Sequence, residues 1–129
     1  MGYRKVQAAL DQHLRGLTLD AVVHHGRPAH LAPGQPCVIT EFLPGRSRAV
    51  FLGISQPEQR EGGYRIHVQD VDLDAALRRV DQISAHFGAG LILTFEGQDT
   101  TLRTHRIGRD TGGLKFVRLP VTIAWRSFF

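Results

Sequence analysis

Histidine and cysteine are the residues of this 129-residue chain that could bind a metal ion. The segment HHGRPAH brings His24, His25 and His30 close together, and Cys37, the single cysteine, follows it. Structural zinc sites usually have four ligands in paired spacing, and catalytic zinc sites usually have three ligands and an open position. His24 and His25 are adjacent, so in a strand they would point to opposite faces. We therefore expect no metal site and no cofactor, although a small metal protein or hydrolase built on these four residues stays an alternative.

The other signals for catalysis are weak. Cys37 opens the apolar run CVITEFL, where a free cysteine is usually a small buried hydrophobic residue. No serine lies in a G-x-S-x-G elbow, and the glycine pairs at 62–63 and 112–113 lack the patterns that bind phosphate. Glu96 and Asp99 stand in the segment EGQD, which is typical of a turn. The sequence therefore predicts that the chain is not an enzyme.

Positive charge is concentrated in the last quarter of the chain. The net charge is +4, and residues 100–129 hold six Lys or Arg against one acidic residue, Asp110. Most of the cations are arginine, which makes bidentate contacts with phosphate and carboxylate groups. A basic nucleic-acid-binding module is therefore one candidate function. Aromatic residues that would stack on bases do not alternate with the arginines, which favours a solvated strand face instead.

Composition predicts one soluble domain over residues 1–129. Hydrophobic residues make up 42% and charged residues 22%, which is ordinary for a globular protein. No run approaches the roughly 20 apolar residues that span a bilayer, so we expect no membrane association. The opening segment MGYRKVQAALDQHLRG has no unbroken apolar core, so a signal peptide is not expected. A single cysteine fits a reducing compartment, and we expect a cytoplasmic location.

Hydrophobic periodicity predicts two helices and several strands. Three- and four-residue spacing indicates helices at about 3–16 and about 72–88, the second with an acidic start and a glycine stop. Alternation and turn residues predict strands at 21–25, 37–43, 47–54, 64–70, 91–95, 100–107 and 114–126. The segment PGR is expected to turn between the second and third strands, and 26–36 and 56–63 are expected to be loops. The fold class is therefore α+β, a mostly antiparallel sheet with two amphipathic helices packed on one face.

Three segments also resemble a known family in their order and spacing. They are GGYRIHV (62–68), DAALRRVDQISAHFGAG (74–90) and RLPVTIAWR (118–126). With the N-terminal helix, the Pro/Gly loop and the hairpin, they resemble the tail terminator, or minor tail protein U-like, family of long-tailed phages and prophages. The resemblance covers nearly the whole chain. The terminal RSFF departs from the family pattern, and the first helix gives little to match.

The resemblance implies a structural role without a cofactor. Proteins of this family form a ring, typically sixfold, that caps the tail tube, stops its polymerisation and meets the head-side connector. Magnesium promotes assembly of some members. The implied partners are further copies of the chain, the tail tube protein and the head–tail connector protein, with DNA only as the passing genome. The chain is expected as a hexameric ring on assembly, with a monomer as the alternative when it is isolated. The implied location is the bacterial host cytoplasm during assembly and then the virion tail. Another head–tail joining or tail completion protein is an alternative.

The last strand suggests where copies would meet. Pro120 lacks an N–H, which predicts an edge strand or a bulge, and the alternating apolar face would then be open to a neighbour. Under this hypothesis the interface residues are Val121, Ile123, Trp125, Phe128 and Phe129. The alternative for the two phenylalanines is that they fold back onto the core of their own domain. Arg103, Arg106 and Arg109 are the candidates to face the lumen and the DNA in a ring.

Overall fold

The computed structural model describes residues 2–19, 21–25, 36–49 and 56–129. The helices are α1 (Gly2–Arg15) and α2 (Leu73–His86). The strands are β1 (Val22–His25), β2 (Cys37–Ala49), β3 (Glu58–Asp70), β4 (Ile92–Phe95), β5 (Gln98–Ile107) and β6 (Val117–Phe128). Both predicted helices are thus present near their expected bounds.

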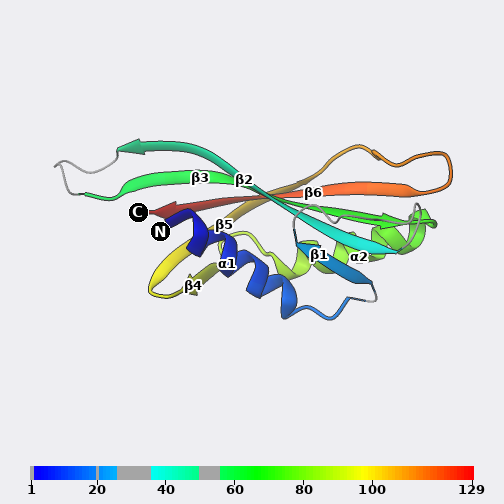
Figure 1. Ribbon diagram of the computed structural model, residues 1–129, viewed down its shortest axis with the longest axis horizontal. Helices are drawn as coiled ribbons and strands as arrows, with labels where there is room; N and C mark the ends of the chain where they lie inside the picture. Colours follow the sequence, from blue (N-terminus) through cyan, green and yellow to red (C-terminus); the bar gives the residue numbers. More distant parts are fainter. Residues whose placement is uncertain (1, 20, 26–35, 50–55) are drawn as a thin grey trace.

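The strands form one sheet in the order β1-β2-β3-β6-β5-β4. Every neighbouring pair is antiparallel except β1 and β2, which are parallel. Figure 1 shows a long, twisted sheet with α1 and α2 on one side and with the short strands β1 and β4 on that same side. The α+β class and the one-sided packing of the helices are confirmed.

Helix α2 forms where its capping residues predict it. Asp72 is the N-cap, and its carboxylate accepts a hydrogen bond from the Asp74 backbone N–H, while Phe87 N–H donates to Ile83 O at the other end. A side-chain acceptor at this position satisfies a donor that the first helical turn leaves unpaired. The helix then buries Ala76, Val80 and Ile83 on the sheet, at the three- and four-residue spacing of one face.

The core lies between the helices and the facing side of the sheet. Residues from α1, α2, β3 and β6 form it, with Leu102 from β5 and Val38 from β2. The fully buried large side chains include Leu10, Leu14, Tyr64, Ile66, Ile83, Phe87, Ile123 and Trp125. Alternate residues of β3 and β6 therefore face the helices, and the residues between them form the other side of the sheet. We call these two sides the inner face and the outer face.

The predicted hairpin around PGR is wrong. Pro44 and Gly45 lie inside the single strand β2, where the pairing with β3 shifts register between Pro44 and Ser47. A Cβ on Gly45 would lie 2.3 Å from the carbonyl oxygen of Glu61, so the bulge requires glycine there. The predicted strand 47–54 lies partly outside the described residues, because residues 50–54 are not among them.

The predicted polar loop at 56–63 is also wrong for most of its length. Residues 58–63 belong to β3 and pair with both β2 and β6. In Figure 1 this end of β2 and β3 extends past the helices as an arm. Without a helix beside it, the arm has no wide apolar face to bury, so its sequence lacks the alternation that marks a half-buried strand.

The predicted edge position of β6 is wrong, because β6 lies in the middle of the sheet between β3 and β5. Gly108 N–H donates to the Pro120 carbonyl at 2.8 Å, just past the end of β5. The N–H and C=O groups of a strand residue point to the same side. The missing N–H of Pro120 therefore faces the place where the β5 ladder has already ended, and a central strand tolerates it.

Candidate assembly surfaces

The outer face of the sheet carries most of the charge that the strands position. One row across four strands is Arg106, Thr122, Arg65 and Glu41, each opposite the next in the pairing register. Five arginines share this face, and two glutamates accompany them: Arg65, Arg103, Arg106, Arg118 and Arg126, with Glu41 and Glu61. The helices leave this face uncovered (Figure 1).

The ion pairs on the outer face are long and exposed. Glu41 Oε1 lies 3.7 Å from Arg65 Nη1 and 3.3 Å from His67 Nε2, and Glu61 Oε1 lies 3.4 Å from Arg103 Nη1. Exposed pairs of this kind contribute only about 0–1 kcal/mol each. The face therefore keeps a net positive charge that is available to an anionic partner.

Arg103, Arg106 and Arg109 are all exposed. Arg103 and Arg106 lie on β5, and Arg109 follows the end of that strand. Their predicted orientation toward a lumen or DNA stays a prediction.

Three of the predicted interface residues lie in the core. Val121, Ile123 and Trp125 are fully buried, and Trp125 Nε1–H donates to the Gly63 carbonyl at 3.2 Å. The Trp125 ring also stacks on Phe42, with 5.6 Å between the ring centres. This fold leaves none of the three any surface to offer a second copy, so the interface prediction is corrected for them. The reason is that the apolar face of β6 meets the domain's own helices.

The two terminal phenylalanines differ. Phe129 folds back, because its backbone N–H and C=O pair with Glu58 at 3.0 and 3.1 Å. Its ring packs edge-on against Tyr3, 5.0 Å between centres, and the Arg60 guanidinium lies 5.0 Å from it. Phe128 remains 42% exposed on the outer face, 5.8 Å from the Arg126 guanidinium. Phe128 is thus the one predicted interface aromatic with substantial exposed surface.

The sheet has two partly open edges on opposite sides. Among the described residues, β1 pairs only with Cys37–Thr40 of β2, and β4 pairs only with residues 98–101 of β5. In the described part of the chain, no strand therefore pairs with the edge of residues 41–49 that faces away from β3. The same holds for the edge of residues 103–107 that faces away from β6. A register shift and arginines occur in both segments, which are features that limit unspecific strand pairing.

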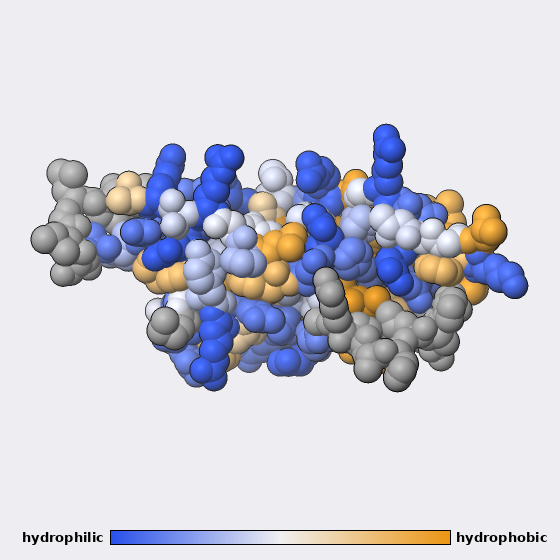
Figure 2. All heavy atoms as spheres, turned by 45° about the horizontal axis from the view of Figure 1, so that its top comes forward, coloured by the Kyte–Doolittle hydropathy of each residue, from blue (hydrophilic) through white to orange (hydrophobic). Residues whose placement is uncertain are grey.

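Exposed apolar side chains gather where α2 begins. Val71, Leu73 and Leu77 are 63%, 51% and 43% exposed, and Leu114, in the β5–β6 connection, is fully exposed. Figure 2 shows apolar surface at the end of the molecule opposite the β2–β3 arm. Leu73 and Leu77 follow the three- and four-residue spacing that predicts this helix, yet the structure leaves both of them exposed. Exposed apolar groups of this size often mark contact sites.

The candidate metal ligands that the structure describes do not form a metal site. His25 Nδ1 lies 3.1 Å from Asp11 Oδ1 and 3.4 Å from Thr40 Oγ1, and His30 lies outside the described residues. In the part of the chain that the structure describes, no three His, Cys, Asp or Glu side chains are placed to hold a metal ion. Cys37 is buried, and burial raises the pKa of its thiol, which disfavours the reactive thiolate.

Asp11 instead belongs to a buried polar link that the sequence did not reveal. The Tyr64 hydroxyl donates to Asp11, and His25 reaches the same carboxylate from β1. Burial raises the pKa of Tyr64, and the adjacent Asp11 carboxylate raises it further. The phenol therefore stays a hydrogen-bond donor that ties α1 to β3.

None of the described helices is long and apolar enough to cross a membrane.

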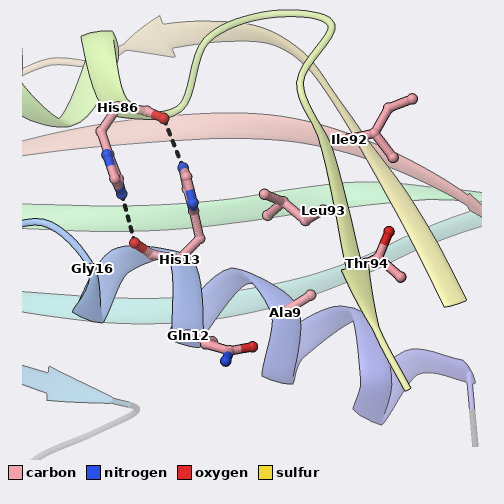
Figure 3. Close-up of a pocket in the computed structure, with 8 residues that line it drawn as sticks. All are labelled: Ala9, Gln12, His13, Gly16, His86, Ile92, Leu93 and Thr94. Atoms are coloured by element: carbon pink, nitrogen blue, oxygen red, sulfur yellow. Dashed lines mark hydrogen bonds between the residues drawn. The ribbon is translucent and has the colours of Figure 1, made fainter. Parts of the chain in front are cut away.

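A second unpredicted contact joins the C-terminal ends of the helices. His13 Nε2–H donates to the His86 carbonyl at 2.7 Å, and His86 Nε2–H donates to the His13 carbonyl at 2.6 Å. The two rings stack 3.9 Å apart, at one end of a pocket between α1 and β4 (Figure 3). Burial lowers the pKa of His13, and repulsion from His86 lowers it further against the opposing hydrogen bond.

No protein-family model and no curated protein matches this chain. Solved structures do match it. One, known only by a sequence identifier, has a TM-score of 0.76 at 17% identity and covers 100% of this chain and 97% of its own. Another is a chain of the virion of a native gene transfer agent particle, with a TM-score of 0.70 at 17% identity, covering 99% of this chain and 98% of its own. At this identity the likeness shows that the fold is shared.

Proposed function

We propose that this chain is a structural protein of a phage-like particle. The observation that carries the proposal is the likeness of its fold to a chain of the gene transfer agent virion, over 99% of this chain and 98% of the other. Structural proteins of this kind act through their surfaces, and this molecule offers an open charged sheet face and exposed apolar side chains at one end. The role requires neither catalysis nor a cofactor.

Within that class, the chain is a tail terminator that forms a ring. The supporting sequence features are GGYRIHV, DAALRRVDQISAHFGAG and RLPVTIAWR, in their order and spacing. The supporting structural feature is asymmetry: the two open edges of the sheet and the apolar end are different surfaces at different places. Contact between unlike surfaces of successive copies is heterologous, and such contacts form a ring when the rotation closes.

The proposed ring caps the tail tube and joins it to the head connector. Its partners are other copies of the chain, the tube protein and the connector protein, in the host cytoplasm during assembly and then in the virion tail. The outer face, with Arg103 and Arg106, is the surface proposed to line the channel, and Arg109 lies beside it. Phe128 and the exposed residues at the start of α2 are proposed to contact neighbours.

Disrupting the gene in the genome that encodes it tests this function. The expected result is heads and tails that remain separate, with tubes of irregular length in electron micrographs, and rescue by the wild-type gene in trans. A matched control restores the gene with the conservative exposed change Lys115→Arg. Particles of normal length and normal joining in the disrupted strain would contradict the proposal.

A nucleic-acid-binding module is the second candidate, favoured by the five arginines on one uncovered face. A gel shift with duplex DNA at physiological salt separates the two functions. A binding module should lose affinity in a salt-dependent way when Arg103, Arg106 and Arg109 are changed to glutamate, because phosphate contacts release counterions. A ring-forming structural protein need not bind free DNA, so the absence of a shift would remove this candidate.

A further inference from the structure

A shallow groove runs along the exposed side of α1, beside β4 and the β4–β5 turn. Four hollows follow one another along the helix, and each shares lining residues with the next, among them Gln12, Phe95 and Lys5. The two hollows that share Gln12 measure about 310 and 350 Å³. We call this the α1–β4 groove. Figure 3 shows its His13 end, with Ala9 on the helix and Leu93 on β4 pointing into the space between the two elements.

The two walls of the groove run in opposite directions. Leu93 and Thr94 lie beside His13 and Gly16, whereas Phe95 lies beside Arg4 and Ala8. Hydrogen bonds also fix the two walls at both ends of the groove. The reciprocal His13–His86 contact fixes one end, and at the other end Gln98 Nε2 donates to the Gly2 carbonyl at 2.9 Å. A groove held at both ends requires little rearrangement before binding.

Strand β4 has an open backbone edge. Leu102 N–H donates to Leu91 O at 2.8 Å, while Leu102 O accepts from Gly90 N–H at 2.7 Å, so the Leu91 carbonyl bonds inward to β5. Inward-bonding residues alternate along an antiparallel ladder, so Leu93 also bonds inward to its partner Thr100. The N–H and C=O groups of Ile92 and Thr94 therefore point away from β5. Among the described residues no strand pairs with that side of β4.

Two free cations flank the groove. Arg4 and Arg15 are exposed on α1, and neither makes an ion pair with a described residue. The 11 residues that separate them in the helix span about 16 Å. Four residues of extended chain span about 13 Å at about 3.3 Å each and keep both side chains on one face, and the long Arg and Glu side chains cover the remaining distance. Three carboxylates lie near the groove. Asp11 accepts a hydrogen bond from the Tyr64 hydroxyl, Asp99 accepts one from the Thr94 hydroxyl, and Glu96 lies beside Lys5 at one end of the groove.

We propose that the α1–β4 groove binds an extended acidic segment of a partner protein, which adds to β4 as a further strand. Backbone bonds to Ile92 and Thr94 supply the pairing, and two carboxylates four residues apart, on the same face of the added strand, meet Arg4 and Arg15. Pairing of an extended segment with an exposed edge is a general mode of peptide recognition. This inference goes beyond the proposed function, because it does not depend on ring formation.

The test is a titration of the ¹⁵N-labelled full chain with a blocked octapeptide. The peptide has Glu at positions 2 and 6 and only Val and Thr between them, and its control has Gln at both positions. The amides of Ile92 and Thr94 should shift with the Glu peptide. We expect about tenfold weaker binding for the Gln peptide, and the same loss for the Arg4→Gln/Arg15→Gln variant. No shift on β4 up to about 1 mM peptide, or shifts confined to Thr122 and Arg106 of the outer face, would overturn the proposal.

A second pair of variants tests strand addition separately from charge. Thr94→Pro removes the outward N–H, whereas Thr94→Val keeps it and also loses the Thr94–Asp99 hydrogen bond. Binding should fall at least tenfold in the proline variant relative to the valine variant. Equal binding by two variants with intact spectra would overturn strand addition. Because the readout uses the isolated chain and a peptide, it is unaffected by the fate of the tail terminator assignment.

Discussion

The two faces of β6 have opposite characters within one strand. Val121, Ile123 and Trp125 point inward and are fully buried, while Arg118, Thr122 and Arg126 alternate with them on the outer face. The inner residues meet both helices, and the outer residues meet no described element other than neighbouring strands. The difference indicates that the inner face stabilises the monomer and that the outer face is free to evolve contacts with partners.

Adjacent substitutions on the two faces should show the largest contrast. Ile123→Ala removes buried methyl and methylene groups from the core and should lower the free energy of unfolding by about 2–5 kcal/mol. Thr122→Ala, one residue earlier on the outer face, should change it by less than about 1 kcal/mol. Urea unfolding followed by tryptophan fluorescence measures both. Equal losses would mean that the outer face is not free in the monomer.

A charged group on the inner side of the sheet should be tolerated only because it is paired. Asp70 is buried and receives hydrogen bonds from Arg79 and from the Asp72 backbone N–H. Burial opposes its ionisation, but the Arg79 and backbone hydrogen bonds outweigh burial and hold the pKa of Asp70 below its ordinary value. Asp70→Asn should therefore destabilise the protein by about 1–3 kcal/mol at pH 7.

That difference should depend on pH. A depressed carboxyl pKa gives stability that is complete above the unfolded value of about 3.9 and is lost as pH falls through the folded value. The gap between wild type and Asp70→Asn should therefore shrink as pH falls from about 5 to 3. Urea unfolding at a series of pH values gives this gap, and one that stays constant over that range would show that the ion pair does not control the titration.

The helix contact made by His13 should have a smaller effect. Its pKa is lowered, so the folded state favours the neutral ring, and stability should decline as pH falls below the unfolded value of about 6.5. His13→Gln keeps a donor for the His86 carbonyl but does not titrate. The melting temperature should fall more between pH 7.5 and pH 5.5 for wild type than for the variant. The extra loss in the free energy of unfolding should be less than about 1 kcal/mol. The same pH dependence in both would assign the titration elsewhere.

The smallest effect is expected on the outer face. Glu41→Gln removes the acidic partner of Arg65 and His67, and exposed pairs at these distances contribute about 0–1 kcal/mol. We expect a change near the low end of that range, which disappears in about 1 M salt because screening is strong there. A loss of about 2 kcal/mol or more in the free energy of unfolding is typical of a buried ion pair and would mean that this face stabilises the fold.

Local sequence features predicted the helices and strands better than they predicted which of these elements lie next to one another in the fold. Periodicity placed both helices, and alternation identified the apolar face of β6. Pro120 then suggested an edge, because sequence does not show that β5 ends where the missing N–H points. The polar arm of β3 resembled a loop, since no helix covers it. The His13–His86 and Asp11–Tyr64 contacts join segments 73 and 53 residues apart, so no local pattern could indicate them.

Native mass spectrometry of the untagged chain, across a concentration series with and without magnesium, tests the central claim most directly. The account predicts that concentration drives the 14.3 kDa monomer into one closed ring, with six copies as the expected number. A monomer at every concentration in both buffers, or an open series of growing oligomers without a preferred size, would contradict it.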